Sequence, residues 1–242
     1  MKKITFCVVA IFTILSCQSP KENTNTTSDA TEDSPNFGIV LHGGAGTILK
    51  KYMSDSLEPV YNQVLEKAIR TGYEVLEKGG TSMEAVTKTI NILEDSPLFN
   101  AGKGAVFTHE ETNELDASVM DGKTLNAGAV AGVKRIKNPI DLAVSVMNDS
   151  PHVMLVGEGA ETFAKTQGFD FVEKEYFFVQ DRYNSLQRIK KTDKTQLDHD
   201  AQANIDDPIT NDYKYGTVGA AALDKHGNLA AGTSTGGMTN KR

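Results

Sequence analysis

The most constraining feature of the sequence is a pair of apolar runs that a short turn joins. Residues 215–223 and 229–235 are rich in Ala, Gly and Thr, and five turn-type residues, 224–228 (DKHGN), separate them. Such a turn folds the two runs back on each other as a β-hairpin. If Leu223 pairs with Leu229, Thr217 faces Thr235 across the hairpin, and two hydroxyl groups then lie side by side.

Two glycines, Gly236 and Gly237, follow the second run directly. Without side chains, they bring bare backbone N–H groups next to the two hydroxyls, as a site for an anionic or carboxamide ligand requires. The same spacing is also consistent with an ordinary β-hairpin that carries unremarkable threonines and a glycine turn. The spacing alone therefore leaves both interpretations open.

From Phe37 onward, short strand-like runs alternate with segments of helical periodicity, which predicts an α/β fold. A buried strand at 37–41 (FGIVL) ends in the glycine-rich loop 42–46 (HGGAG). Helices are predicted at about 57–78, from Thr81 or Ser82 to Ser96, from Pro139 onward, at 159–166 and at about 182–189. Strands are predicted at 105–108, 115–120 and 127–133, as an antiparallel meander, and at 153–156.

Composition narrows the function classes. The chain has 242 residues, of which 39% are hydrophobic and 24% charged, as in a soluble globular protein with one compact domain. The formal net charge of -7 supplies no basic surface for phosphates, so we expect no nucleic-acid partner. Both cysteines, Cys7 and Cys17, lie at the start, so the rest of the chain has no disulfide, thiolate metal site or cysteine nucleophile.

The N-terminal residues 1–17 have the pattern of a signal peptide. Lys2 and Lys3 precede a mostly apolar run that ends in Ser16 and Cys17, and residues 14–17 (ILSC) resemble a bacterial lipobox. We expect lipid attachment at Cys17 and an extracytoplasmic, membrane-anchored location; an ordinary secretory signal is the alternative. Residues 18–36 are polar and predict a flexible tether, and a second polar stretch, about 190–215, predicts a mobile linker.

Seven sequence blocks in order give the chain a specific resemblance to one family, the plant-type asparaginase/isoaspartyl peptidases. The blocks are residues 42–46 (HGGAG), 96–107 (SPLFNAGKGAVF), 114–122 (ELDASVMDG), 150–154 (SPHVM), 157–161 (GEGAE), 216–220 (GTVGA) and 233–241 (TSTGGMTNK). The resemblance runs from Phe37 to the last residue.

The resemblance implies an N-terminal-nucleophile hydrolase with an αββα four-layer sandwich, here with its C-terminal part missing. Such a precursor cuts itself between Gly216 and Thr217, so that 37–216 form the α-subunit portion and 217–242 begin the β-subunit. It hydrolyses L-asparagine and β-aspartyl dipeptides, small-molecule substrates, as a dimer of αβ units. A threonine hydroxyl needs a base, and the α-amino group of an N-terminal Thr217 can supply it.

The same resemblance assigns further roles. Thr235 is the second threonine, which hydrogen-bonds and tunes Thr217, and Asn100 helps to orient the nucleophile or its water. Catalysis needs no cofactor. A structural sodium ion is implied on the backbone carbonyls of Leu93, Glu94, Ser96, Phe99, Ala101 and Lys103. The histidines have no metal-ligand spacing, and His42 belongs to a structural loop near the nucleophile.

The family continues beyond the point that matches Arg242. The continuation carries an arginine and an aspartate that bind substrate, a third active-site threonine and the oxyanion donors, so only Gly236 and Gly237 remain here as substrate-binding candidates. We therefore expect the 242-residue chain alone to be inactive. Two alternatives remain: a glycosylasparaginase, which has the same nucleophile logic, and a non-catalytic binding lipoprotein on a decayed hydrolase scaffold.

Overall fold

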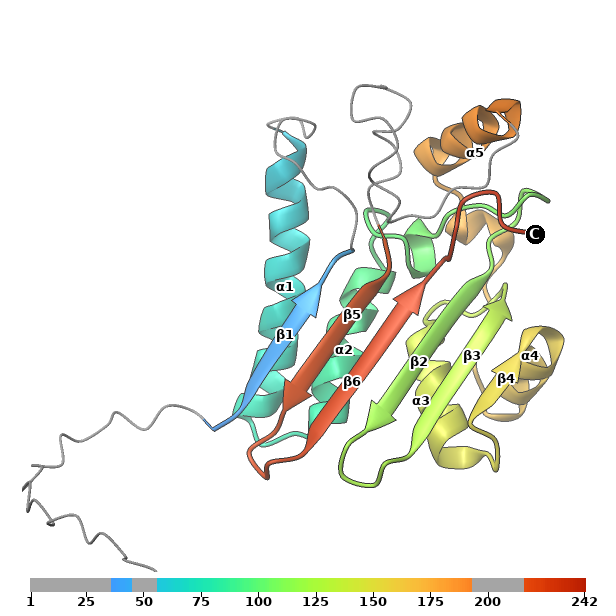
Figure 1. Ribbon diagram of the computed structural model, residues 1–242. Helices are drawn as coiled ribbons and strands as arrows, with labels where there is room; N and C mark the ends of the chain where they lie inside the picture. Colours follow the sequence, from blue (N-terminus) through green and yellow to red (C-terminus); the bar gives the residue numbers. More distant parts are fainter. Residues whose placement is uncertain (1–35, 45–55, 193–215) are drawn as a thin grey trace, which may run out of the picture. The chain divides into compact units, whose positions relative to one another are not determined.

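The computed structural model describes residues 36–44, 56–192 and 216–242, which form a six-stranded sheet with helices packed on it (Figure 1). The strand order is β1-β5-β6-β2-β3-β4. Neighbouring strands are antiparallel except β3 and β4, which are parallel. The strands are β1 Gly38–His42, β2 Leu115–Asp121, β3 Ala127–Val133, β4 Met154–Val156, β5 Val218–Leu223 and β6 Leu229–Thr235.

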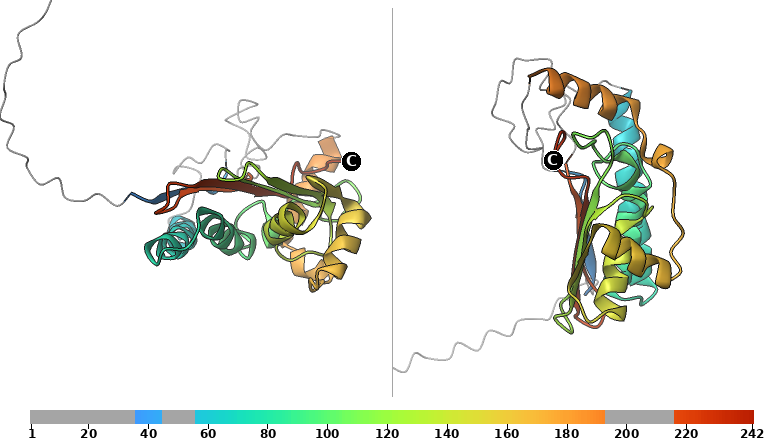
Figure 2. Two further views of the ribbon diagram at one scale, coloured as in Figure 1. Left: turned by 90° about the horizontal axis from the view of Figure 1, so that it is seen from below. Right: turned by 90° about the vertical axis from the view of Figure 1, so that its right-hand side faces the viewer.

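Four helices cover one face of this sheet (Figure 2): α1 Leu57–Glu77, α2 Ser82–Glu94, α3 Pro139–Asp149 and α4 Gly157–Thr166. Local sequence explains where two of them begin. Thr81 and Glu84 form a reciprocal capping box at the start of α2, and Pro139 occupies the first turn of α3, where no N–H is needed. The remaining elements are α5 Gln180–Thr192 and the 3₁₀ turns η2 Gly102–Gly104 and η3 Lys174–Phe177.

The two faces of the sheet differ sharply in burial. Alternate residues that point to the helices, such as Val119, Val130 and Val218, are buried with the apolar faces of α2 and α3 in one core. On the other face no described helix lies against the sheet (Figure 2). Large apolar side chains are exposed there, including Val40 at 67% and Leu229 at 59%. The described residues thus supply one helix layer and one sheet layer of the predicted sandwich.

Several sequence predictions are confirmed. β5 and β6 pair in the predicted register, with Leu223 opposite Leu229 and Val218 opposite Ser234. β2 and β3 are antiparallel neighbours, and the helices expected from 57, 82 and 139 begin there. The described elements therefore have the α/β pattern that the hydrophobic periodicity indicates.

Other predictions were wrong. Residues 105–108 form no strand; Phe107 makes only an isolated bridge to Asn113, so the antiparallel neighbours of β2 are β3 and β6 rather than a third meander strand. The run is apolar because Val106 and Phe107 are buried, not because it joins the sheet. Helix α4 begins two residues before the predicted 159, and α5 extends over 180–192 instead of about 182–189.

Helix α5 is longer than expected because it docks on the rest of the fold through both apolar and charged contacts. Tyr183 packs edge-on against Phe107 at 5.6 Å between ring centroids. The Glu111 carboxylate accepts hydrogen bonds from Tyr183 at 3.0 Å, Gln187 at 3.2 Å and Lys190 at 2.8 Å. These bonds lower the pKa of Glu111 to about 2, with Lys190 as the main cause.

The predicted signal peptide at 1–17, nearly all of the tether at 18–36, and residues 193–215 of the predicted linker lie outside the described residues. Residues 190–192 are helical, so the predicted linker was wrong over those three residues. Within the parts of the chain that the structure describes, no helix combines the length and the apolar character that crossing a membrane requires.

Candidate active site

Thr217 and Thr235 lie next to each other where β5 begins and β6 ends. The Thr217 hydroxyl donates a hydrogen bond to Thr235 Oγ1 at 3.0 Å, and both side chains are partly buried. Thr235 Oγ1 also accepts a hydrogen bond from the backbone N–H of Gly237 at 3.0 Å. The predicted pairing of the two hydroxyls is thus present, and the glycine turn takes part in it.

Gly216, which precedes Thr217, is buried against the glycine loop that follows β1. Gly44 has φ +143°, a backbone conformation that side-chain-bearing residues rarely adopt. A Cβ at Gly44 would lie 2.7 Å from the backbone N and 3.2 Å from the Cα of Gly216. The two backbones therefore touch only because Gly44 lacks a side chain, which explains the glycine at this position.

Asn100 is fully buried and uses both ends of its amide. Its Nδ2 donates to the carbonyl oxygen of Gly237 at 2.8 Å, and its Oδ1 accepts from the N–H of Val106 at 3.0 Å. Its own carbonyl oxygen accepts from the N–H of Gly236 at 3.0 Å. Asn100 therefore holds the turn that donates to Thr235, so its described contacts reach the threonine pair through that turn.

Glu94 is a buried acidic residue at the end of α2, next to β6. The sequence analysis considered only its backbone carbonyl, as a sodium ligand. Glu94 Oε1 accepts from Ser234 Oγ at 2.6 Å and from the Ile140 N–H at 3.0 Å, and Oε2 accepts from Asn138 at 3.1 Å. Burial raises the pKa of Glu94 to about 8 despite these bonds. The only sequence signal was an acidic residue at the buried C-terminal end of an amphipathic helix, where charge is unusual.

Comparison with known proteins shows the family of the chain. A profile of the family described as Asparaginase matches residues 35–242. The chain belongs to the asparaginase family. The isoaspartyl peptidase of Escherichia coli is 51% identical over 203 residues, which are 84% of this chain and 62% of that protein. The isoaspartyl peptidase/L-asparaginase of Xenopus laevis is 39% identical over 204 residues, 84% of this chain and 60% of that protein.

This asparaginase-family chain spans less than two thirds of the length of those relatives. The family is one of N-terminal-nucleophile hydrolases, and the mixed sheet with its helix layer is consistent with that fold. The predicted family and fold class are therefore confirmed.

The loop after α2 contains the carbonyls on which a sodium ion is implied. Two observations show that this loop curls tightly. A Cβ on Gly104 would lie 2.7 Å from the Pro97 carbonyl oxygen, and Gly102 has φ +50°. Carbonyl oxygens are suitable ligands for a hard cation, and each can accept a second interaction besides its N–H bond. The Lys103 ammonium lies 5.3 Å from the centre of the Tyr176 ring, which is a cation–π partner for its charge.

Two further side chains near the threonine pair were missed by sequence reasoning. Asp116 on β2 is the register partner of Thr235 on β6, and Lys241 lies 3.7 Å from the Asp116 carboxylate. Only the strand pairing reveals this proximity, because Asp116 is far from Thr235 in sequence.

His42, at the end of β1, is the register partner of Gly219 and contributes an exposed ring on the same side as Thr217.

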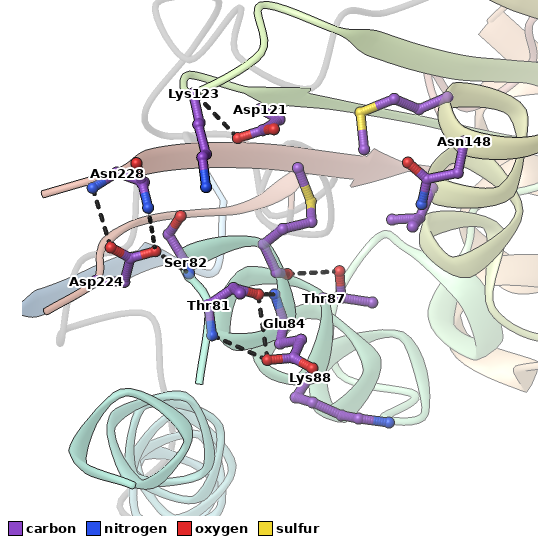
Figure 3. Close-up of a pocket in the computed structure, with 13 residues that line it drawn as sticks. Thr81, Ser82, Glu84, Thr87, Lys88, Asp121, Lys123, Asn148, Asp224 and Asn228 are labelled. Atoms are coloured by element: carbon purple, nitrogen blue, oxygen red, sulfur yellow. Dashed lines mark hydrogen bonds between the residues drawn. The ribbon is translucent and has the colours of Figure 1, made fainter. Parts of the chain in front are cut away.

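A pocket of about 410 Å³ lies at the opposite end of the β5–β6 hairpin (Figure 3). The N-terminus of α2, the two hairpin turns and α3 surround it. The buried Asp224 accepts hydrogen bonds there from the N–H groups of Ser82 at 3.2 Å, His226 at 2.9 Å and Asn228 at 3.0 Å. Sequence reasoning identified residues 224–228 only as a turn, which the hydrogen bonds to Asp224 explain.

Proposed function

We propose that this chain carries the nucleophile of an isoaspartyl peptidase/L-asparaginase that cuts itself between Gly216 and Thr217. The observation that carries the proposal is the 3.0 Å hydrogen bond between Thr235 and Thr217, the second residue of the GTVGA block. The substrates would be β-aspartyl dipeptides and L-asparagine, in keeping with relatives such as the isoaspartyl peptidase/L-asparaginase of Xenopus laevis.

Self-cleavage begins with attack of Thr217 Oγ1 on the carbonyl carbon of Gly216. The C–N bond between the two residues breaks, the new amine takes the hydroxyl proton, and an ester joins Gly216 to the Thr217 oxygen. Water then hydrolyses that ester, which leaves a Gly216 carboxylate and a free Thr217 amino group. Gly216 has no side chain to obstruct the attack, and its close packing against Gly44 holds its backbone in place.

In the mature form the Thr217 α-amino group, with an ordinary pKa of about 7.7–8.0, accepts the proton of its own hydroxyl. The oxygen attacks the side-chain amide carbon of the substrate, and the leaving amine departs with a proton. Water hydrolyses the resulting aspartyl ester and regenerates the threonine. Thr235 keeps the hydroxyl oriented, and Asn100 keeps the Gly236–Gly237 turn in place for Thr235.

We further propose that the open sheet face packs against the portion of the relatives that this chain does not match. That portion would add the second sheet and helix layer of the sandwich, the α-carboxylate and α-amine binding groups and the oxyanion donors. Without oxyanion donors a hydrolase loses on the order of 10² to 10³ in rate for each donor. The 242-residue chain by itself would then be inactive.

The test uses an extended protein, in which residues 1–242 are joined to the further length that the relatives carry. We expect spontaneous cleavage to a fragment that begins TVGAAALD, and release of aspartate from L-asparagine and a β-aspartyl dipeptide. Thr217→Ala should stay one chain and release no aspartate, and the 242-residue chain alone should also release none. Cleavage elsewhere in the extended protein, or cleavage of Thr217→Ala at the same bond, would refute this proposal.

For the location, we propose lipid attachment at Cys17, supported by the lipobox-like residues 14–17 and the polar stretch that follows them. The extended protein should partition into the detergent phase of a Triton X-114 extract, and Cys17→Ser should move to the aqueous phase. Retention of Cys17→Ser in the detergent phase would contradict lipidation at this residue.

For assembly and ion binding, we propose a dimer of αβ units and a structural sodium ion on the 93–103 loop. The curled backbone of that loop supports the ion site. Replacing NaCl by choline chloride at equal ionic strength should lower the melting temperature of the extended protein, and light scattering should give twice the mass of one αβ unit. No change in melting temperature would contradict the ion site.

A further inference from the structure

Lys241 is held firmly beside the glycine turn of the site. Its side chain is 16% exposed, and its Nζ donates to the Glu114 carbonyl oxygen at 2.9 Å. Its stem lies against Gly237, where a Cβ would be 3.2 Å from Lys241 Cδ. The Lys241 carbonyl oxygen accepts from the His109 N–H at 2.8 Å. The position of the ammonium is therefore fixed from both its backbone and its side chain.

The Asp116 carboxylate is also held in position, and its charge is opposite to that of Lys241. One carboxylate oxygen accepts from the N–H of Gly132 at 2.8 Å, and the other lies 3.7 Å from Lys241 Nζ. Asp116 and Thr235 are register partners, so their Cβ atoms are about 4.5–5.5 Å apart. Thr235 in turn lies 3.0 Å from the Thr217 hydroxyl. One intervening residue, Thr235, therefore separates Asp116 from Thr217, and Lys241 lies beside Asp116.

We propose that Asp116 and Lys241 form a charge-balanced pair that sets the pH at which the Thr217 amine becomes a free base. The proposal rests on the proposed function, because that amine exists only after cleavage before Thr217. The Asp116 anion favours the protonated amine and raises its pKa, whereas the Lys241 cation disfavours it and lowers its pKa. With both charges present the two effects largely offset each other.

Other charged groups near the site belong to neighbouring elements and are controlled for. His42 on β1 faces Gly219, on the same side of β5 as Thr217. His109 is hydrogen-bonded to Asn240 at 2.9 Å, and the Glu114 carboxylate is paired with Lys134 at 3.1 Å. A His42→Gln background removes the imidazole that could add its own titration to the pH profile.

The experiment measures kcat/KM against pH for a β-aspartyl dipeptide with the extended protein, where the rising limb reports the base of the free enzyme. Lys241→Met keeps an apolar stem but leaves Asp116 unbalanced, so the limb should move to higher pH. Asp116→Asn keeps an acceptor for the Gly132 N–H but leaves Lys241 unbalanced, so the limb should move to lower pH. Each shift should be about 0.5 to 1 pH unit.

The Lys241→Met/Asp116→Asn double variant should return the limb close to its original position, and Lys241→Arg should leave it unmoved. Loss of packing alone would lower activity without moving the limb in opposite directions. Shifts of the same sign, or no shift in either single variant, would overturn the pair's role. If Lys241→Met does not fold, Asp116→Asn and Lys241→Arg still decide the question. Absence of cleavage or hydrolysis in the unmodified extended protein would instead overturn the proposed function.

Discussion

The two ends of the β5–β6 hairpin both gather polar groups, but they satisfy them differently. At the turn, the Asp224 carboxylate accepts four N–H bonds, two of them from Asn228, and sits beside a pocket of about 410 Å³. At the other end, the Thr217 hydroxyl and the Gly237 N–H both donate to Thr235 Oγ1. The Thr217 hydroxyl is the proposed nucleophile.

The difference shows that a cavity lined by charged residues need not be the reactive site. The acids at the pocket are engaged in local structure: Glu84 caps α2, Asp121 closes the β2–β3 turn and Asp224 closes the β5–β6 turn. The threonine pair instead lies at a strand end, on the face of the sheet that no described helix covers. Chemistry is expected at one end of the hairpin and stability at the other.

The largest effect on turnover, after removal of the nucleophile itself, is expected for Thr235→Ala in the extended protein. The variant loses the group that links Thr217 to the glycine turn, so the rate of aspartate release should fall about 10²–10³-fold, as for loss of one preorganised hydrogen-bonding group. Thr233→Ala is the matched control, since it alters the same strand two residues away. A comparable loss in Thr233→Ala would show that the strand, not the hydroxyl pair, matters.

A smaller loss is expected for Asn100→Asp. In the unmodified chain Asn100 Nδ2 donates to the Gly237 carbonyl oxygen at 2.8 Å. The substitution puts a carboxylate oxygen in place of Nδ2, so two acceptors face each other and the turn that donates to Thr235 should shift. We expect about 10- to 10²-fold lower kcat, since misplacement of a positioning group by a fraction of an ångström has effects of this order. Steady-state assays of the extended protein would check this, and an unchanged kcat would contradict the positioning role.

The Thr235 and Asn100 tests concern residues that the sequence already singles out. The hairpin register follows from turn length and the two-residue period of strands, so the Thr217–Thr235 pair was predictable. The helices were predictable because their apolar stripes and caps are local. By contrast, the apolar run at 105–108 resembles a strand because burial selects apolar residues with or without a ladder.

The contacts that link distant elements could not be predicted. The Glu94–Ser234 bond joins residues 140 positions apart, and the Asp116–Thr235 register depends on which strand lies beside β2. Local periodicity contains no information on strand order, so a third meander strand and β6 were indistinguishable as neighbours of β2. The resemblance supplied the roles of Thr217, Thr235 and Asn100, whereas geometry supplied their supporting residues.

A still smaller effect on turnover, below about tenfold, is expected for Glu94→Gln, because Ser234 points away from the threonine pair and Gln keeps one acceptor. Its effect on stability should depend on pH. The folded pKa of Glu94, about 8, exceeds its ordinary 4.5, so the folded state holds a proton that the unfolded state releases. The contribution of Glu94 to the free energy of unfolding therefore falls as pH rises from 4.5 to 8.

Urea unfolding at several pH values between 5 and 8 would test this prediction. Glu94→Gln should gain in stability relative to the unmodified chain as pH rises through that window. Glu111→Gln is the comparison, because the pKa of Glu111 is lowered to about 2 and its contribution is lost only below pH 4.5. A constant difference for Glu94→Gln across the window would contradict the raised pKa.

No effect on turnover is expected at the turn end, where Asp224→Asn should act on stability alone. In the unmodified chain several N–H groups point at the Asp224 carboxylate. The amide of the variant would put an NH₂ donor against some of these N–H groups, so the free energy of unfolding should fall by about 1–3 kcal/mol. Burial raises the pKa of Asp224, but the bonds from Asn228, Ser82 and His226 outweigh it and hold that pKa below 3.8. The stabilisation is therefore present above about pH 4 and is lost as pH falls through the lower folded pKa. Asp121→Asn, on the more exposed β2–β3 turn, should cost less, and a drop in kcat for Asp224→Asn equal to that of Asn100→Asp would remove the distinction between the two ends.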